Sequence, residues 1–535
     1  MTRKRPNIII INPDEMRVDT MGHMGNPAAI TPALDEFAAN EAVSFSSCYC
    51  QNPVCVPSRC SFFTGLYPHV NGHRTMAHLL QPHETSMFQE MMHQGYHVWM
   101  NGRNDLVATE YDGLVESHAD EIFYGFKDDR RENFKRGKLD NPKEKEEDIK
   151  KFRSSFYEGK SDKAMDGDWE DAAGAVERIR TMHELGKPLC MFIGLMNPHP
   201  EYRCEEPWFS AIDRSKVPER IRPEECSGKS YIEEKIREYQ ELGEYPEEAW
   251  RELRATYLAQ CSKVDAIFKE ICDALKEAGE YDNSAIFFFS DHGDFTGDYG
   301  LAEKAQNTFE DCLTKVPMLI KPPKDFGKVD TGVSDSIIEL VDFYATAMDF
   351  AGVEPEHDHF GRSTRPILEN RESKIRDVAF CEGGRMPYEY QCDEYHISGP
   401  NGPKKGGLYW PKQKAQSDNT AHAKGTMITD GHYKYVHRTI GSCEFYDLTE
   451  DPKEKINRIN DEKYSLQIAE FKMKMLDWYQ STCDIVPRKF DSRVTAEKII
   501  RMVGKDVSPE VEEKVRELIK KGSSMVTVIN VIKGE

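Results

Sequence analysis

The sequence lacks a long apolar segment, since no hydrophobic run approaches the roughly 18 residues of a membrane-spanning helix. The run from Asn7 to Ile11 is too short for the centre of a secretory signal, and polar residues follow it at once. The 14 cysteines include no Cys-x-x-Cys pair, and without an export signal we expect their thiols to stay reduced. We therefore expect a cytoplasmic protein without membrane association.

Positive charge is also in deficit, with 71 Lys and Arg against 93 Asp and Glu and a formal net charge of -22. Such a surface repels nucleic acids and disfavours a long polyanionic substrate. A small anion in a locally positive pocket remains compatible with it. The sequence has no low-complexity tract or internal repeat, and a composition of 39% hydrophobic and 31% charged residues is that of a globular protein.

Continuous runs of β-branched, aliphatic or aromatic residues predict strands that are buried on both faces. These runs are Asn7 to Ile11, Leu189 to Leu195 and Ala285 to Phe289. Residues 249–278 carry apolar side chains at three- and four-residue spacing, which predicts an amphipathic helix. Alternating strands and helices over residues 1–370 predict an α/β fold with a large, mainly parallel sheet flanked by helices.

The pattern changes after Gly361, where short strand-like pieces are separated by turns. Residues 378–381, 433–437 and 444–448 predict a smaller antiparallel sheet. We predict a large α/β domain over residues 1–370, an α+β subdomain over 371–490 that completes the pocket, and a tail over 491–535.

Three further segments carry local predictions. The tail reads as a helix over 509–521 and a short strand over 525–532, which could pack on the body or form a homo-oligomer contact. The charge-dense stretch 124–168 predicts a surface excursion. Residues 399–419, rich in Gly, Pro, Lys and Asn, predict a loop.

The segment from Cys55 to Arg59, with the sequence Cys-Val-Pro-Ser-Arg, predicts a loop that leads into a helix. Pro57 suits the first helical turn, where its missing N–H costs nothing. The free N–H groups of that turn and the helix dipole favour a bound anion, and Arg59 adds a permanent positive charge. A nucleophile at Cys55 would attack an anionic ester held at this site, and the alternative is a buried structural cysteine beside a helix start.

Carboxylates and one imidazole follow two of the predicted strands. Asp14 and Glu15 come after the first strand, and Asp291 and His292 come after the third. Oxygen ligands with one imidazole fit a hard divalent cation, Ca²⁺ or Mg²⁺ or else Mn²⁺. The alternative is that Asp291 caps the end of a strand and the following glycine makes a turn.

The pattern Cys-x-Pro-Ser-Arg-x-x-x-x-Thr-Gly resembles the signature of the type I sulfatases in the alkaline phosphatase superfamily. The resemblance implies that a maturase oxidises the cysteine to formylglycine. One hydroxyl of the hydrated aldehyde would then attack sulfur, and the other would expel sulfate. It also implies a divalent metal, with Ca²⁺ favoured, that binds sulfate oxygens. Its ligands would be Asp14, Glu15, Cys55, Asp291 and His292.

The resemblance implies roles for further residues. Arg59 and Lys304 match cations around the sulfate, and His199 matches an imidazole that protonates the leaving oxygen. Arg103 stands where the family has Lys. Asp105 stands where the family has His, which makes it a candidate base, although a helix N-cap or loop carboxylate is the structural alternative.

Substrate contacts are assigned to loops around this site. His73, Arg74 and Arg103 are the candidate substrate-binding residues, and His73 is the alternative to Asp105 as the base. Residues 382–385 and 399–419 are candidate substrate-reading loops.

Three functions are compatible with these motifs. The first is a sulfuric ester hydrolase that acts on a small sulfated sugar after a maturase has modified Cys55. The second is a phosphonate monoester hydrolase or phosphodiesterase, because Glu15 and His292 are similar to that branch of the superfamily. The third is a binding protein that keeps Cys55 unmodified. The resemblance covers residues 5 to 480 and leaves the tail unexplained.

Intact mass separates the enzymes from the binding protein. We expect protein made with a matching maturase to be about 18 Da lighter than its sequence mass, because the aldehyde replaces sulfur with oxygen and loses two hydrogens. The Cys55→Ser variant, made in the same cells, should show its own sequence mass. Fully unmodified protein from a host with an active maturase would contradict the formylglycine assignment.

Overall fold

The computed structural model describes residues 5–138, 157–164, 166–243, 245–488, 493–504 and 506–534. Within them lies a nine-stranded sheet in the order β10-β2-β9-β8-β1-β6-β3-β4, with β11 also paired to β2. Its strands are β1 (Asn7–Asp14), β2 (Val43–Tyr49), β3 (His97–Asn101), β4 (Glu121–Phe123), β6 (Leu189–Pro198), β8 (Ser284–Phe289), β9 (Lys315–Lys321), β10 (Gly332–Ser334) and β11 (Ile338–Glu339). All neighbouring pairs are parallel except those of β9 with β2 and β8.

Strand β1 runs through the middle of this sheet. Its residues Ile8 to Ile11 pair with Cys190 to Ile193 of β6 and with Ala285 to Phe288 of β8. Alternate isoleucines enter the hydrophobic clusters on the two faces of the sheet. Burial on both faces explains why these strands appear in the sequence as continuous apolar runs.

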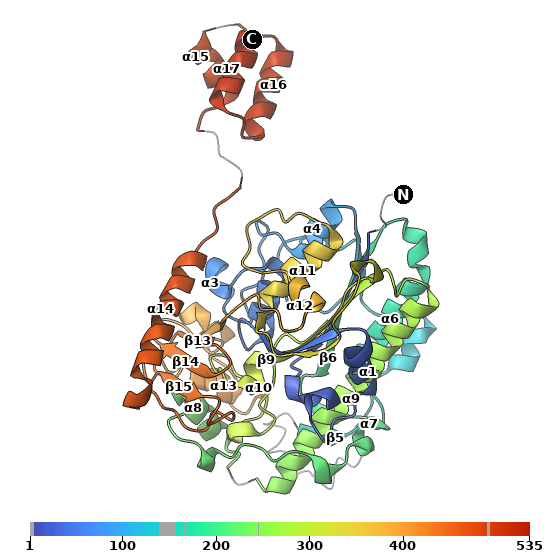
Figure 1. Ribbon diagram of the computed structural model, residues 1–535, viewed down its shortest axis with the longest axis vertical. Coiled ribbons are helices and arrows are strands. Elements are labelled where there is room, and N and C mark those ends of the chain that lie inside the picture. Colours follow the sequence, from blue (N-terminus) through green and yellow to red (C-terminus); the bar gives the residue numbers. More distant parts are fainter. Residues whose placement is uncertain are drawn as a thin grey trace. The chain divides into compact units, whose positions relative to one another are not determined.

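Helices cover both faces of the large sheet (Figure 1). One face is covered by α1 (Pro32–Asn40), α6 (Asp168–Thr181) and α9 (Glu247–Glu277). The other is covered by α2 (Cys55–Thr64), α4 (Met87–His93) and α11 (Val341–Ala351). The predicted α/β class with a large, mainly parallel sheet is confirmed.

Helix α2 is buried along its whole length. Its Phe62 and Phe63 pack edge-on against Phe289 of β8 and Phe192 of β6. It ends at Gly65, whose φ of +70° is left-handed and whose missing Cβ would meet a side-chain atom at 2.8 Å. These contacts anchor the C-terminal half of α2, the buried helix that carries Cys55 at its first position.

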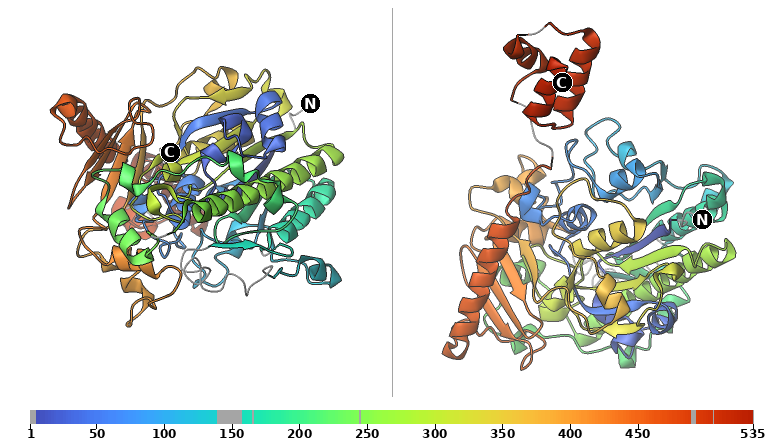
Figure 2. Two further views of the ribbon diagram at one scale, coloured as in Figure 1. Left: turned by 90° about the horizontal axis from the view of Figure 1, so that it is seen from below. Right: turned by 45° about the horizontal axis from the view of Figure 1, so that its top comes forward.

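A four-stranded antiparallel sheet lies beside the large sheet, as both views in Figure 2 show in orange. It consists of β12 (Ala379–Gly383), β13 (Gly425–Thr429), β14 (Tyr433–Arg438) and β15 (Glu444–Asp447). Helix α14 (Ser465–Thr482) packs Phe471 and Trp478 into the same cluster as Phe380 and Phe445. The predicted smaller sheet is confirmed, with β13 as an additional strand.

The structure describes all or part of the three segments that carried local predictions. Residues 399–419 are not a loop throughout, because α13 (Trp410–Gln416) forms there, with Pro411 in its first turn. Of the stretch 124–168, residues 139–156 and 165 lie outside the described residues. After residue 156, β5 (Tyr157–Lys160) pairs with β7 (Tyr202–Cys204).

The strand predicted over 525–532 is wrong, because α17 (Met525–Lys533) forms there. The Ser524 side chain caps it by accepting a hydrogen bond from the Thr527 N–H. Val528 and Ile532, four residues apart, are buried with α15 (Ala496–Val503) and α16 (Pro509–Lys520). Packing of this helical face overrides the strand preference of the β-branched residues.

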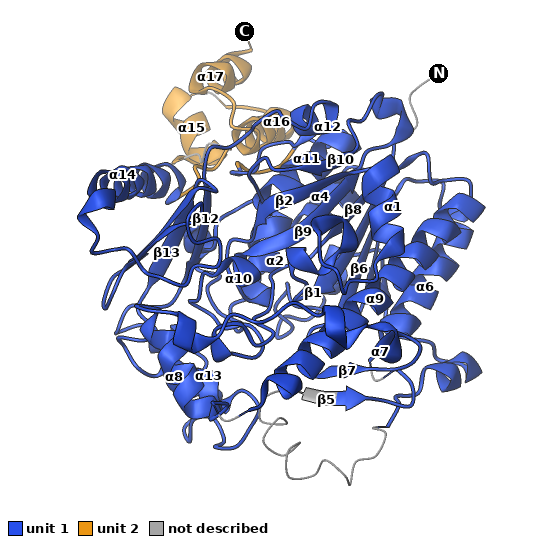
Figure 3. Ribbon diagram, turned by 60° about the horizontal axis from the view of Figure 1, so that its bottom comes forward, with its two compact units in different colours: residues 1–354, 359–483 blue, residues 355–358, 484–535 orange. Residues whose placement is uncertain are grey.

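The chain divides into two compact units, coloured in Figure 3. One comprises residues 1–354 and 359–483, and the other comprises 355–358 and 484–535. No helix of the described residues combines the length and apolar character needed to cross a bilayer.

Arg376, three residues before β12, forms a buried ion pair network with β11 and α11. Its Nη1 lies 2.8 Å from Glu339 of β11, and its Nε donates to Asp342 of α11 at 2.7 Å. We expect Arg376→Met to lower the free energy of unfolding by about 3–5 kcal/mol, because it leaves two buried carboxylates without their cation.

Urea unfolding followed by tryptophan fluorescence measures this loss. Arg365→Met is the matched control, because Arg365 pairs with Asp349 at 2.9 Å where both side chains are about one-third exposed. That change should cost at most about 1 kcal/mol. Equal losses in the two variants would refute a bracing role for Arg376.

Candidate active site

Four loops converge at the carboxyl ends of the central strands. Asp14 ends β1, His199 follows β6, and Asp291 follows β8. Cys55 is the first residue of α2, after Val54 in extended conformation. Parallel neighbours bring their carboxyl ends to one edge, so residues far apart in the sequence meet there.

Asp14, Cys55, Asp291 and His292 form a buried group that we call the Asp-Cys-His cluster. Their ligand atoms all lie within 4.8 Å of one another. The Cys55 Sγ lies 3.5 Å from Asp14 Oδ1 and 3.2 Å from His292 Nε2. Since His292 Nδ1 lies 3.0 Å from the Gly293 carbonyl oxygen, it donates there and leaves Nε2 free to face the cluster. Two carboxylates and one imidazole lone pair fit a divalent cation.

Two arginines balance the carboxylates. Arg59 Nη2 donates to Asp14 Oδ2 at 3.0 Å, and Arg59 Nε donates to Asp291 Oδ2 at 3.1 Å. Arg103 Nη2 also contacts Asp14. Burial acts to raise the pKa of Asp14, but the positive charges of Arg103 and Arg59 hold it well below its ordinary value. Among the described residues Arg59 Nη1 is buried without a hydrogen-bond acceptor, so this donor is available to an anion.

Glu15 lies beside the cluster rather than in it. Its φ is +68°, and its backbone N–H donates to Asp291 at 3.1 Å. Its carboxylate accepts from the backbone N–H and the Nζ of Lys304, each at 2.8 Å. Burial raises the pKa of Glu15 to about 8, although Lys304 acts to lower it. With Asp14 and His199, Glu15 makes a neighbouring group of potential ligand atoms.

His199 lies near Glu15, the same carboxylate that pairs with Lys304. Its Nδ1 lies 2.5 Å from the Pro200 carbonyl oxygen, and its Nε2 lies 3.6 Å from Glu15. Burial and the charge of Lys304 lower the pKa of His199 well below its ordinary value. The ring is therefore neutral, with Nδ1 as the donor.

Asp105 lies against the two arginines. Its Oδ2 is 3.3 Å from Arg103 Nε and 3.7 Å from Arg59 Nε, and its side chain is 26% exposed. The local turn is capped by Asn104, whose side chain accepts from the N–H groups of residues 106 and 107. Capping therefore does not account for Asp105.

The other two predicted substrate contacts are engaged elsewhere. His73 Nε2 lies 2.8 Å from Glu84, and its Nδ1 lies 2.8 Å from a backbone carbonyl. Arg74 donates to Glu389 at 2.7 Å. Neither residue lines the cavity beside Lys304.

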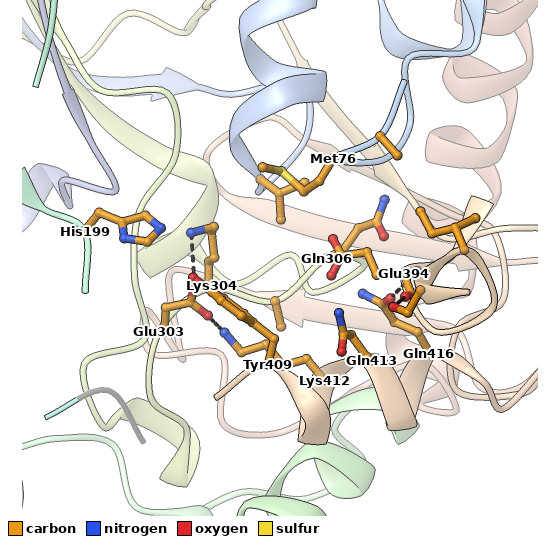
Figure 4. Close-up of a pocket in the computed structure, with 15 residues that line it drawn as sticks. Met76, His199, Glu303, Lys304, Gln306, Glu394, Tyr409, Lys412, Gln413 and Gln416 are labelled. Atoms are coloured by element: carbon orange, nitrogen blue, oxygen red, sulfur yellow. Dashed lines mark hydrogen bonds and ion pairs between the residues drawn. The ribbon is translucent and has the colours of Figure 1, made fainter. Parts of the chain in front are cut away.

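That cavity has a volume of about 430 Å³ and opens beside His199 and Lys304 (Figure 4). The residues around it include Gln306, Glu394, Tyr409, Lys412, Gln413 and Gln416. Tyr409 to Gln416 lie in the segment predicted to read the substrate. Gln306 and Glu394 were missed, since neither belongs to a recognisable motif.

A second buried acidic group contains Glu233, Glu310 and Glu444. Lys229 lies within it, with its Nζ 2.6 Å from Glu310 and 3.9 Å from Glu233. Because a side-chain ammonium already balances these carboxylates, this group is a structural ion network.

The sequence is similar to those of known proteins. The family model described as Sulfatase matches residues 6–353. The multifunctional alkaline phosphatase superfamily protein PehA of Trinickia caryophylli is 25% identical, covering 90% of this chain and 96% of that protein. An N-acetylglucosamine-6-O-sulfatase of Bacteroides thetaiotaomicron is 24% identical, covering 89% of this chain and 86% of that protein.

The fold has similar solved structures as well. The phosphonate monoester hydrolase of Agrobacterium radiobacter superposes with a TM-score of 0.68 at 20% identity, covering 89% of this chain and 96% of that one. The family match spans more than half of the sequence and all the strands that carry the Asp-Cys-His cluster. The chain therefore belongs to the sulfatase family of enzymes.

Proposed function

We propose that the protein is a sulfuric ester hydrolase that cleaves a sulfate monoester of a small sugar, with formylglycine made from Cys55 by a maturase. The position of Cys55 carries this proposal. It begins a buried helix, lies 3.2 Å from His292 and 3.5 Å from Asp14, and has Arg59 one turn along α2. A nucleophile at this point would meet an anion among helix N–H groups and an unpaired guanidinium donor.

Asp14, Asp291 and His292, with the residue 55 side chain, would hold the divalent metal. When bound, that metal polarises sulfate oxygens and favours the ionised form of a nearby hydroxyl. Oxygen ligands outnumber nitrogen in the cluster, so we favour Ca²⁺, with Mg²⁺ and Mn²⁺ as alternatives. Glu15 would act indirectly, by fixing Lys304.

The basic side chains would orient the ester. Arg59 offers its free Nη1, and Lys304, already held by Glu15 and Glu303, offers its remaining N–H to a sulfate oxygen. Arg103 keeps Asp14 ionised from the other side. Because these groups are fixed by ion pairs before the substrate arrives, little reorganisation is needed on binding.

Proton transfer would fall to His199 and Asp105. His199 lines the cavity that would take the alcohol part of the ester, so it is well placed to protonate the leaving oxygen. The negative charge of a bound ester would counteract the burial that keeps the ring neutral. Asp105, partly exposed beside Arg59 and Arg103, would accept the proton that releases sulfate.

Size and charge support a small sugar as the alcohol. A cavity of about 430 Å³ suits one or two sugar rings, and its glutamines and tyrosine are groups that bind hydroxyls. The net charge of -22 opposes a long sulfated polymer. The second candidate is a phosphonate monoester hydrolase, favoured by the pairing of Glu15 with Lys304 instead of with the cluster.

If the Asp-Cys-His cluster binds the metal, a change in this cluster should weaken Ca²⁺ binding and a change in another acidic group should not. Asp291→Asn should lower the affinity for Ca²⁺ by about 10-fold or more, because a charged ligand becomes neutral. Calorimetric titration of metal-free protein measures it, with Mg²⁺ and Mn²⁺ as competitors. Glu233→Gln, in the ion network around Lys229, is the control and should bind Ca²⁺ as wild type does. Unchanged affinity in Asp291→Asn would place the metal elsewhere.

The reaction is tested by paired rates on an aryl sulfate and an aryl phosphonate monoester. We expect the kcat/KM for the sulfate to exceed that for the phosphonate, and Cys55→Ser to reduce hydrolysis to background. A panel of monosaccharides sulfated at different positions then identifies the natural ester. Much faster turnover of the phosphonate would reject the sulfatase assignment in favour of the second candidate.

A further inference from the structure

The cavity has two chemically different sides. Figure 4 shows His199 and Lys304 on one side and Gln306 and Glu394 on the other. Gln413 and Gln416, on α13, complete the second side. The cations that a sulfate group needs are therefore confined to one end of the cavity.

The second side contains two hydrogen-bond acceptors that receive no hydrogen bond from the described residues. The Glu394 carboxylate has no hydrogen bond or ion pair within the described residues, although the Glu394 backbone N–H donates to Gln416 Oε1 at 2.9 Å. Gln306 is 2% exposed, and its amide nitrogen donates to the Arg74 carbonyl oxygen. Its Oε1 is buried without a partner. The Glu394 carboxylate and Gln306 Oε1 can therefore both accept hydrogen bonds from a ligand.

The neighbouring charges do not neutralise Glu394. Asp393, next to it in the chain, is already paired with Arg385 at 2.8 Å. Lys412 contacts Glu303, and Lys304 is divided between Glu303 and Glu15. Burial raises the pKa of Glu394, and Lys304 acts to lower it. A second anion at this end of the cavity would meet a carboxylate that pairs with no cation among the described residues.

We propose that Gln306, Glu394, Gln413 and Gln416 form a subsite for the hydroxyl-bearing face of the sugar, and that Glu394 excludes substrates with a second acidic group. The carboxylate accepts hydrogen bonds from hydroxyls and repels a carboxylate or an additional sulfate. This inference rests on the proposed function and specifies its substrate class as singly sulfated sugars whose other groups are neutral hydroxyls.

Two aryl sulfates of matched size test this directly, one with a meta-hydroxymethyl group and one with a meta-carboxylate. Wild-type enzyme should favour the hydroxymethyl ester in kcat/KM. Glu394→Gln should shrink that preference by about tenfold or more, because it removes the like charge and keeps the shape. Glu394→Asp, which keeps the charge, should retain the preference. Glu372→Gln, an exposed glutamate away from the cavity, should behave as wild type.

The outcomes separate this inference from the proposed function. If wild type hydrolyses both esters with a preference that Glu394→Gln leaves unchanged, the role of Glu394 is wrong and the proposed function stands. If wild type neither hydrolyses nor, by calorimetry, binds either ester, both fail. The affinities of the Cys55→Ser variant for the two esters, measured by calorimetry, test the same preference without turnover. Equal thermal melting of the variants shows that a change in preference does not come from misfolding.

Discussion

The balance between buried carboxylates and arginines organises this protein around Cys55. Asp14 and Asp291 lie fully buried at the ends of β1 and β8, where unpaired charge would be very costly. Arg59 bridges both carboxylates from α2, and Arg103 reaches Asp14 from the loop after β3. These ion pairs hold the strand ends, the helix and the loop together and thereby fix the position of Cys55, the proposed nucleophile.

The same balance explains why the cavity is asymmetric. Each cation near the reaction centre has a carboxylate partner, so little positive charge is left over for a second anion. Lys304 shows this most clearly, because Glu15 and Glu303 both contact its ammonium. At the far side Glu394 has no such partner among the described residues. The proposed selectivity for a singly charged ligand would follow from this carboxylate, which has no cation partner in the described part of the chain.

Much of the fold could be predicted from the sequence because burial leaves a pattern. Strands β1, β6 and β8 are covered on both faces and therefore appear as unbroken apolar runs. Helix α17 could not be predicted in this way, because its residues favour strands and only packing against α15 and α16 selects a helix. Strand β13, five residues long and beginning with glycine, carried too little signal to be recognised.

The candidate site likewise contains some residues that could be predicted from the sequence and others that could not. Cys55, Asp14, Asp291 and His292 meet because each follows a recognisable strand or begins a recognisable helix. Glu15 stands next to Asp14 in sequence, but its left-handed backbone turns the carboxylate toward Lys304, and no spacing rule reveals that. Gln306 and Glu394 belong to no sequence motif, and only the fold brings them to the cavity. Motifs therefore locate the proposed reacting group, and only the fold shows which other side chains surround the cavity.

Under the proposed function, the burial of Cys55 would require its modification to precede the docking of α2. Its side chain is 2% exposed at the start of a helix that is itself buried along its length. A modifying enzyme that has to hold this segment in its own active site can do so only while α2 is still undocked. Folding and modification would then compete for the same cysteine during synthesis, and a chain that folds first keeps its thiol. The fraction of active protein in a preparation would therefore be determined during synthesis. Later addition of maturase would not raise it.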